Sequence, residues 1–472
     1  MSVLNILDFG GINTKASPLL SKAGTLLTCV NMDTDPIGGK TKRPGIEKLL
    51  DNPDGAQVNN LFQWEAENSS PNILYRVSGT KVYYHNLNSP GTAWNVCGNG
   101  TISGGGRFGH AVLDNTLIGG NGVGPTRHTT SGTSFTNTPL APFGKYFAEE
   151  FGRVYIGGTA SDLFWSTAND PTNWSTAGTA DSSSIKIPGA GKINSVFSQY
   201  GRIHVGKTGR SLHRWDTYAR DKVPTRNPPS SHWSLAEVDD LVFFANRNGI
   251  FVQDAVKPTL ISSAVEKQFY NRSDTGIAGT LFDDIVGGEF RENYYLSAGS
   301  ITDPTTGYQL DRAVIRYDYY KNEWVNYQFP TLPTAWGQYV DTNGKLWQIF
   351  GDSTGQVYRV NPTASTDDGE AIEAYLEGVS HLEHPERDKS IGFIHVFANP
   401  GCQAKVQVCT GDNLNQSTRR WIDIGDLKPG YTRLEMPKDQ SRGKFLFFRI
   451  YESSKDPAFT IYGIVVEFEL ER

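Results

Sequence analysis

Cysteine is scarce in this sequence, which has four such residues in 472. None of them falls in the closely spaced pairs that hold structural zinc, and their density is far below that of a disulfide scaffold. We therefore expect buried or free thiols in a reduced compartment. Cys402 and Cys409 face opposite ways if they share one continuous strand, so they can pair only across a hairpin. The other two cysteines are Cys29 and Cys97.

Long apolar runs and an excess of positive charge are also missing. No stretch approaches the roughly 18 consecutive apolar residues of a membrane-spanning helix. Residues 1–15 lack a basic stretch followed by an apolar core, so the sequence predicts neither a signal peptide nor a membrane anchor. Charged residues make up 20 % of the chain and the net charge is −6. The basic footprint expected of a protein that grips nucleic acid is therefore absent from the composition.

Glycine and aromatic residues are abundant instead. The chain has 50 glycines and 12 % aromatic residues, which is typical of many turns between packed sheets. Residues 145–175 show the pattern best: a short strand, a turn at Gly157 and Gly158, a second strand, and then Trp174. Weaker copies occupy residues 201–215, 240–254 and 344–360. Repetition at roughly 40–50 residues indicates a β-propeller, whose ring of blades leaves few open edges.

The periodicity divides the chain into four parts and places it in the all-β class. Residues 57–361 predict a β-propeller of about seven blades, with six to eight allowed. Residues 362–372 predict a polar, acidic linker. Residues 373–472 carry longer strands between clear turns, which predicts a β-sandwich. Residues 1–56 show little periodicity, so we expect an irregular segment that packs on the propeller and on neighbouring subunits.

Local signals refine this division. Ser263 and Glu266 have the spacing of a capping box, which predicts a short helix through Tyr270. The final strand alternates apolar residues with glutamates over residues 466–471, as a half-buried strand does. The candidate blade strands are residues 72–77, 81–85, 111–113, 153–156, 202–205, 241–244, 294–297, 313–318, 324–327 and 346–350.

One stretch matches a phosphate-binding loop letter for letter. Residues 201–208 read Gly-Arg-Ile-His-Val-Gly-Lys-Thr, but that loop must connect a buried strand to a helix. Ile203 and Val205 instead stand at strand spacing inside the loop, and a second strand-like run follows. We therefore expect a blade hairpin and no nucleotide site.

Other patterns of catalytic residue types are equally weak. A glycosidase needs two carboxyl groups roughly 5–10 Å apart across a cleft, whereas neighbouring carboxylates such as Glu149 and Glu150 point to opposite faces of a strand. His381, His384 and His395 suit a metal only on a helix, and Pro385 favours a surface turn. Residues 169–174 predict a turn whose tryptophan anchors a blade. We therefore assign no catalytic, cofactor-binding or metal-binding residue and expect no enzymatic activity.

The N-terminal residues carry a resemblance to a known family. The stretches in order are Asp8–Lys15, Ser17–Leu20, Cys29–Met32 and Lys40–Gly45. This order resembles the N-terminus of the tail accessory proteins of short-tailed bacteriophages, also called tail stabilisation or nozzle proteins. One spacer residue of the family pattern is absent, because Gly10 directly follows Phe9. Residues 169–174 resemble a second landmark of the family, so the likeness covers about the first third of the chain.

The resemblance implies a structural role in the virion. It implies a homohexameric ring below the portal and its adaptor ring, which extends the channel for DNA ejection. The expected partners are other copies of this chain, the adaptor, tail fibres or other tail proteins, and genome DNA that passes without specific binding. The expected location is the virion tail, after assembly in the host cytoplasm. Candidate assembly contacts are Asp8, Phe9, Asn13, Lys42 and Arg43.

A second hypothesis is a receptor-binding or glycan-binding tail propeller, possibly with glycan hydrolase activity. It requires exposed aromatic side chains on one face, for which Tyr83, Trp94 and Trp336 are candidates. Aromatic residues in a propeller more often pack between blades. A generic propeller scaffold from a host is a third hypothesis, which the N-terminal residues disfavour.

Overall fold

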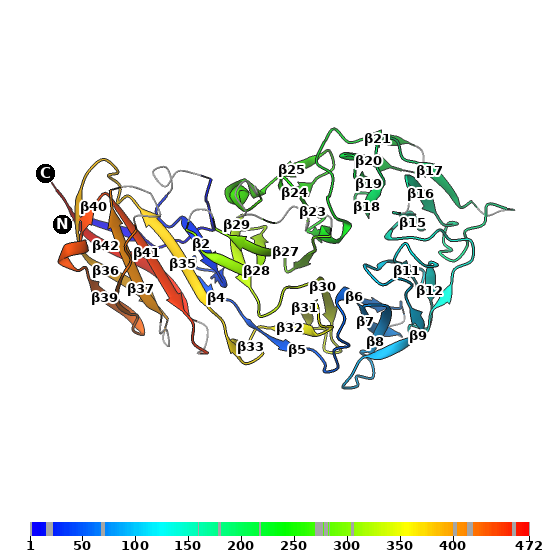
Figure 1. Ribbon diagram of the computed structural model, residues 1–472, viewed down its shortest axis with the longest axis horizontal. Helices are drawn as coiled ribbons and strands as arrows, with labels where there is room; N and C mark the ends of the chain where they lie inside the picture. The colour runs from blue at the N-terminus through cyan, green and yellow to red at the C-terminus, as the bar shows by residue number, and fades with distance from the viewer. Residues whose placement is uncertain are drawn as a thin grey trace.

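A computed structural model describes residues 2–15, 22–67, 71–158, 160–177, 181–216, 219–269, 277, 282, 284–303, 306–399, 404–412, 419–455 and 459–471. The described chain is all-β, with only short 3-10 helices between its strands. A ring of small sheets occupies one end of the molecule, and longer strands from both chain termini occupy the other (Figure 1). No helix among the described residues is long and apolar enough to cross a membrane.

Five antiparallel sheets of four strands each form the main part of the ring. In each of them the strands pair in sequence order, as the blades of a propeller do. Their strands are β6 (Val58–Glu65), β7 (Asn72–Ser78), β8 (Lys81–Asn86), β9 (Asn95–Thr101); β10 (Gly109–Leu113), β11 (Thr116–Gly120), β12 (Arg127–Thr129), β13 (Thr136–Asn137); β14 (Tyr146–Glu150), β15 (Arg153–Gly157), β16 (Asp162–Trp165), β17 (Ser183–Lys186); β18 (Ile193–Ser198), β19 (Ile203–Lys207), β20 (Ser211–Trp215), β21 (Arg220–Lys222); and β22 (Ala236–Val238), β23 (Leu241–Asn246), β24 (Gly249–Gln253), β25 (Pro258–Leu260).

Two further meanders complete the ring and belong to larger sheets. The first is β26 (Gly287–Phe290), β27 (Asn293–Thr302), β28 (Gln309–Asp318) and β29 (Glu323–Gln328); the second is β30 (Ala335–Val340), β31 (Leu346–Gly351) and β32 (Val357–Asn361). The N-terminal strand β5 (Gly45–Lys48) pairs antiparallel with β32 and so supplies the outer strand of the last blade. The innermost strand β30 lies against β6. The blade count therefore falls within the predicted range of six to eight.

Burial in the blades follows from their stacking around the ring. Val154, Tyr155 and Ile156 are all buried although successive side chains of a strand point to opposite faces. Each blade is covered on both faces by its neighbours, so its middle strand is apolar on both sides. The backbones of adjacent blades also come close: a Cβ on Gly337 would lie 2.7 Å from the Leu61 carbonyl oxygen. Residues 201–208, which match a phosphate loop, form the predicted hairpin of β19 and β20.

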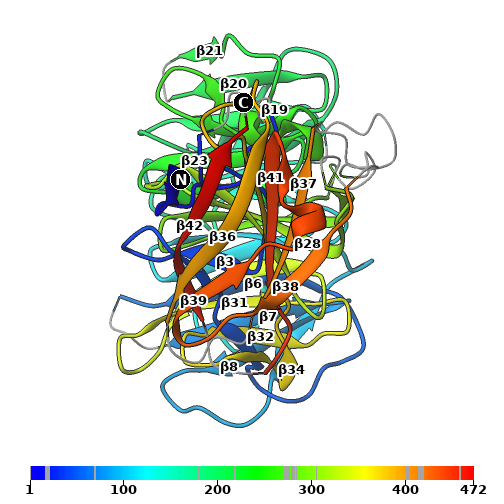
Figure 2. The same ribbon diagram turned by 90° about the vertical axis from the view of Figure 1, so that its left-hand side faces the viewer.

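Two facing sheets form the other end of the molecule (Figure 2). One contains β1 (Ser2–Ile6), β3 (Met32–Thr34), β4 (Lys40–Lys42), β36 (Lys389–Ala398), β39 (Gly430–Glu435), β40 (Arg442–Gly443) and β42 (Thr460–Leu470). The other contains β2 (Leu26–Val30), β35 (Ala374–Ser380), β37 (Lys405–Gly411), β38 (Ile422–Asp426) and β41 (Phe445–Glu452). Both contribute to one core, for example through Ile394 and Ile450. This arrangement is consistent with the predicted β-sandwich.

The prediction that residues 1–56 are irregular is wrong. They contain five strands, β1 to β5; all but β3, which pairs with β4, also pair with strands far away in sequence. Strand β1 pairs with β42, and β2 pairs with β35 on one side and with β29 at Val30 and Asn326 on the other. These strands are only three to five residues long, so local periodicity does not reveal them. The predicted linker, residues 362–372, likewise contains the short strands β33 (Thr366–Asp367) and β34 (Glu370–Ala371).

The predicted capping box is also wrong. The 3-10 helix η2 (Ser262–Gln268) begins after Ile261, and no side chain caps it. Ser263, the predicted cap, lies inside the helix, and the hydroxyl of the preceding Ser262 accepts a hydrogen bond from the backbone N–H of Ile250 at 2.9 Å. The serine is therefore used to attach the helix to strand β24. Tyr270, Cys402 and the Ser17–Leu20 stretch lie outside the described residues.

Candidate functional site

The predicted assembly contacts are mostly buried inside the chain. Phe9, Lys42 and Arg43 are 0 %, 2 % and 1 % exposed, so the prediction that their side chains contact other proteins is wrong. Asp8 is exposed and Asn13 is half-buried. The residues of the N-terminal signature are thus used within the molecule, at the junction between the propeller and the two C-terminal sheets.

Arg43 is the centre of this junction. Its Nη1 and Nη2 donate to the two carboxylate oxygens of Asp367 at 2.9 and 2.6 Å. The remaining donors reach the side-chain oxygen of Asn31 at 2.8 Å and the carbonyls of Pro44 and Gln328 at 3.0 and 2.8 Å. All five N–H donors of the guanidinium are therefore satisfied. The guanidinium also lies 4.3 Å from the ring centroid of Phe329.

Two lysines on β4 extend the junction to partners in both halves of the molecule. Lys40 forms an ion pair with Glu323 of the propeller strand β29 at 3.2 Å. Lys42 forms one with Glu452 of the C-terminal strand β41 at 2.7 Å. Both lysine side chains are fully buried. Lys40 and Lys42 are two positions apart, so their side chains project from the same face of β4, and this one short strand has ion pairs to both halves of the molecule.

Glycine is required where this segment enters the last blade. A Cβ on Gly45 would lie 1.9 Å from the carbonyl oxygen of Thr366. No side chain fits that space without moving the backbone of β33. The Lys-Arg-Pro-Gly stretch therefore joins the propeller, the short strands after it and the C-terminal sheets at one point.

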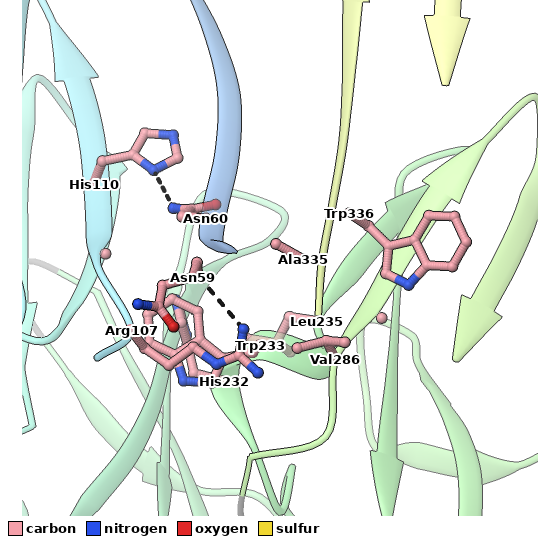
Figure 3. A pocket seen from close by; sticks show the side chains of 12 residues that line it. Asn59, Asn60, Arg107, His110, His232, Trp233, Leu235, Val286, Ala335 and Trp336 are labelled. Atoms are coloured by element: carbon pink, nitrogen blue, oxygen red, sulfur yellow. Dashed lines mark hydrogen bonds between the residues drawn. The ribbon is translucent and has the colours of Figure 1, made fainter. Parts of the chain in front are cut away.

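A second candidate site is a pocket of about 220 Å³ at the centre of the ring. Its walls come from the beginnings of the innermost strands β6, β10, β22, β26 and β30 (Figure 3). These residues are Asn59, Asn60, Arg107, Gly109, His110, His232, Trp233, Leu235, Val286, Gly287, Ala335 and Trp336. Sequence analysis missed this site, because its residues share no motif and only their place at the strand starts relates them. We call it the axial pocket.

The charged group of the axial pocket is already paired. The Arg107 guanidinium donates through Nε and Nη2 to the two carboxylate oxygens of Asp284 at 2.9 and 3.0 Å. It also donates to the carbonyl of Thr334, so it joins three different blades. Arg107 is 8 % exposed. Its role in the described structure is to hold the inner strands together.

The hydrogen bond of His110 favours the neutral imidazole. The Asn60 amide nitrogen lies 3.2 Å from His110 Nδ1 and donates to the Phe108 carbonyl at 2.7 Å. The Asn60 oxygen accepts from the backbone N–H of Leu61 at 2.8 Å, which fixes the orientation of the amide. Nδ1 must therefore accept a hydrogen bond, so a proton there would face another donor. Burial lowers the pKa of His110 to about 4.

His232 also lines the axial pocket, and its imidazole is likewise neutral. Burial, followed by the charges of His110 and Lys145, lowers the pKa of His232 to about 3. Its ring lies 5.0 Å from the ring of Tyr146. The two histidines therefore stay uncharged at neutral pH and act as polar packing groups.

We expect acid to destabilise the fold through these rings. A histidine whose pKa is lower in the folded state gives stability that is complete above about pH 6.5 and is lost as the pH falls toward about 4. The loss for His110 is at most about 3 kcal/mol. The variant His110→Phe keeps the stacking on Phe62, whose ring centroid is 3.6 Å away, and removes the titration. Urea unfolding at several pH values in this range measures how the free energy of unfolding changes with pH.

The control is the same variant above about pH 7. There the free energy of unfolding of His110→Phe and that of the wild-type protein should change with pH in the same way. An equal loss of stability in both proteins between about pH 6.5 and 4 would contradict the assignment of this titration to His110.

Among the described residues that line the axial pocket, none has a carboxylate, hydroxyl or thiol side chain. No group of three or more metal-ligating side chains occurs among the described residues. His381 and His384 lie in the predicted turn, in which Leu382 and Glu383 have positive φ. His395 lies elsewhere, where its Nε2 is 2.9 Å from Glu467 and its Nδ1 is 2.6 Å from the Tyr431 hydroxyl.

The three aromatic candidates for a glycan-binding face are buried. Tyr83, Trp94 and Trp336 are 6 %, 4 % and 8 % exposed. Arg76 lies over the rings of Tyr83 and Trp94 at 4.2 and 5.2 Å. Trp336 Nε1 donates to the Ser297 hydroxyl at 2.9 Å and points away from Arg107 (Figure 3). These three side chains pack between blades and supply no glycan-binding face.

Comparison with known proteins identifies no family for this chain. No family model and no curated protein matches the sequence. Similar solved structures include the computationally designed Ika8 protein (11 % identity, TM-score 0.39), covering 66 % of this chain and 99 % of that chain. A chain of the Mitotic Checkpoint Complex (10 % identity, TM-score 0.41) covers 68 % and 96 %, and YCF48 bound to D1 peptide (11 % identity, TM-score 0.41) covers 68 % and 99 %. At these scores the likeness carries no argument about function, and the strand pairings alone establish the propeller.

Proposed function

We propose that this protein is a structural component of a bacteriophage tail, in which copies form a ring that extends the channel for DNA ejection. The proposal rests on the N-terminal resemblance and on one structural observation. Three residues of the resembling stretch, Phe9, Lys42 and Arg43, are buried at the junction of the two halves of the chain. In a structural protein, a sequence signature of this kind specifies the relative position of two rigid bodies.

The nine-stranded sheet supports a rigid body. It runs from the propeller strands β26–β29 through β2 to the C-terminal strands β35, β41, β37 and β38. The sheet therefore crosses the junction, where β2 and β29 pair at Val30 and Asn326, and Lys40, Lys42 and Arg43 add buried ion pairs there. A spacer between tail components needs this property, because bending between its halves would misalign a central channel.

The assembly itself is tested by imaging and mass. We expect the purified protein, alone or mixed with its adaptor, to form a closed ring with six copies in negative-stain electron microscopy. Light scattering after size-exclusion chromatography gives the independent mass. A ring is expected because most soluble oligomers close by rotational symmetry.

A labelled copy of the protein in assembled particles gives the location. Label at the tail, between the head and its tip, is the expected result. The proposal would be contradicted if the protein stayed monomeric in the presence of its adaptor and were absent from purified tails.

A further inference from the structure

One of the two C-terminal sheets ends in two strands that each have an unpaired side. Among the described residues, β1 pairs only with β42, and β39 pairs only with β36. Strands β42 and β36 pair with each other between them, so the two edges lie on opposite sides of one sheet. The N-terminal end lies at the rim of this sheet, beside β42 (Figure 2). An edge of this kind presents backbone N–H and C=O groups with which another strand can pair.

The two edges are level with each other across the sheet. Asn5 and Arg433 are exposed at the two edges, whereas Leu4 and Leu434 beside them are buried. The pairing register connects these positions in two rows, Asn5–Val465–His395–Arg433 and Leu4–Val466–Ile394–Leu434. A strand added at either edge would therefore continue both rows and keep the same side toward the core.

The strand directions also allow the two edges to join. Every pairing from β1 through β42 and β36 to β39 is antiparallel, so β1 and β39 run in opposite directions. When a second copy continues the sheet in the same orientation, the β39 edge of one copy meets the β1 edge of the next as an antiparallel pair. Because the two edges are different surfaces, the contact is head-to-tail, and such contacts close into rings.

Strand β1 lacks the features that protect edge strands from pairing. Residues 2–6 include no charged residue and no proline, and the pairing of β1 with β42 has no bulge. By contrast, the edge strand β38 of the facing sheet carries Asp423 and Asp426, and its register with β37 shifts. Charges and bulges of this kind oppose the addition of a further strand. The edge at β38 is therefore protected, whereas the edge at β1 is open.

Side chains next to the two edges suit a contact between copies. Val3 and Leu7 are 54 % and 57 % exposed at the β1 edge, and Tyr431 is 48 % exposed at the β39 edge. In the continued sheet, the Leu7 end of β1 lies beside the Tyr431 end of β39. Asp8 and Lys428, which follow and precede these ends, are exposed and form no ion pair within the described chain. The contact would cover apolar side chains and bring opposite charges together.

We propose that β39 of one copy pairs with β1 of the next copy, so that these sheets continue from subunit to subunit around the ring. This inference rests on the ring of the proposed function, and it names the surface through which the copies join. It gives the exposed Asp8 of the N-terminal signature a place at the contact, whereas Phe9 and Arg43 of the same signature remain inside the chain.

Crosslinking of introduced cysteines tests the pairing directly. Rings of the double variant Asn5→Cys, Arg433→Cys, treated with a short bismaleimide, should give a ladder of covalent multimers on a denaturing gel. Side chains on paired strands are about 5 Å apart at Cβ when directly opposed and about 7–8 Å apart on the diagonal. Within one chain, the same two positions are separated by three strand spacings, or about 14 Å. A short reagent therefore joins two copies and does not bridge one sheet.

The single variants are the matched controls for the crosslink. Asn5→Cys or Arg433→Cys alone supplies only one of the two edges, so neither should give the ladder. A mixture of the two single variants should give covalent dimers and nothing larger, because each copy then carries one introduced thiol. The double variant Asn5→Cys, Asp423→Cys places the second thiol on the protected β38 edge and should not be crosslinked.

Lysines on the β1 edge test the same contact without a reagent. We expect Val3→Lys, Asn5→Lys to lower the fraction of protein in rings on the order of tenfold or more, because lysines on an edge oppose strand addition. Both positions are exposed, so the midpoint of urea unfolding should not change. The matched control Val256→Lys, Asn343→Lys lies on exposed propeller turns and should leave the ring fraction within about twofold.

The outcomes separate this pairing from the ring itself. Rings that give no ladder, or that the lysines on β1 leave unchanged, would overturn the pairing of β39 with β1 while the proposed ring stands. A protein that forms no ring with its adaptor present would contradict both proposals.

Discussion

Replacing Arg43 with alanine is expected to lower the free energy of unfolding by about 3–5 kcal/mol. The variant leaves the Asp367 carboxylate, which is 4 % exposed, buried without its partner. It also removes the donors that Arg43 supplies to two carbonyls and to the Asn31 side-chain oxygen, which then keeps only the backbone N–H of Gln328. Equilibrium unfolding in urea measures the loss through the shift of the transition midpoint.

The neighbouring pair Lys48–Asp368 provides the control for this variant. It joins the same two segments of the chain, but its side chains are 46 % and 38 % exposed. Lys48→Ala should therefore cost less than about 1 kcal/mol. Equal effects of Arg43→Ala and Lys48→Ala would mean that burial of the junction does not determine its stability. Arg43→Lys separates charge from shape, because an ammonium group cannot make the paired contacts to Asp367.

A second large effect is expected at Glu377, in the C-terminal sheets. Its carboxylate is fully buried and accepts from Arg419 at 2.7 Å and from Arg449 at 2.8 Å. The Tyr375 hydroxyl donates to the same group at 2.6 Å. Glu377→Ala leaves two arginines close together without the intervening negative charge, so we expect a loss of about 3 kcal/mol or more. Thermal or urea unfolding of the full chain gives the difference.

Glu386 offers a carboxylate control in the same part of the chain. Its contact with His384 is 3.7 Å long and its side chain is 65 % exposed, so Glu386→Ala should change stability by less than about 1 kcal/mol. Glu377→Gln keeps the shape and removes the charge. If Glu377→Gln were as stable as the wild-type protein, hydrogen bonding alone would hold the two arginines, and the electrostatic explanation would be wrong.

The two variants act on different requirements of the proposed ring. Arg43 fixes the junction, whereas Glu377 pairs two arginines within one of the C-terminal sheets. Loss of ring formation in Arg43→Ala under conditions where the chain stays folded would therefore point to the relative position of the two halves. Loss in Glu377→Ala would point to the C-terminal surface.

The strands of the blades could be predicted because they depend on local sequence. Runs such as residues 72–77 and 313–318 are apolar or β-branched, and glycine-rich or polar turns bound them, so each strand is defined by its own residues. The recurrence of such runs predicted the ring and a range for the blade count. The strand pairings of β6–β13 follow directly, because consecutive strands in a meander pair with each other.

The junction and the axial pocket could not be predicted from the sequence, because they depend on contacts between residues far apart in the chain. Lys42 and Arg43 look like a solvated basic cluster in the sequence, and only Glu452 and Asp367, brought there by the fold, make their burial favourable. Tyr83, Trp94 and Trp336 likewise became interior residues because a neighbouring blade or strand covers them. The residue types therefore marked these positions as candidates, whereas the burial of their side chains depends on residues far away in the sequence.

By itself the sequence determined an all-β chain of repeated meanders followed by longer strands, because hydrophobic spacing and turn residues act over a few neighbouring positions. Only the tertiary structure decided that the N-terminal segment closes the last blade, joins the two halves and buries its charges. Strand pairing and charge compensation across hundreds of residues leave no periodic trace in the sequence, since each partner contributes only one or two positions.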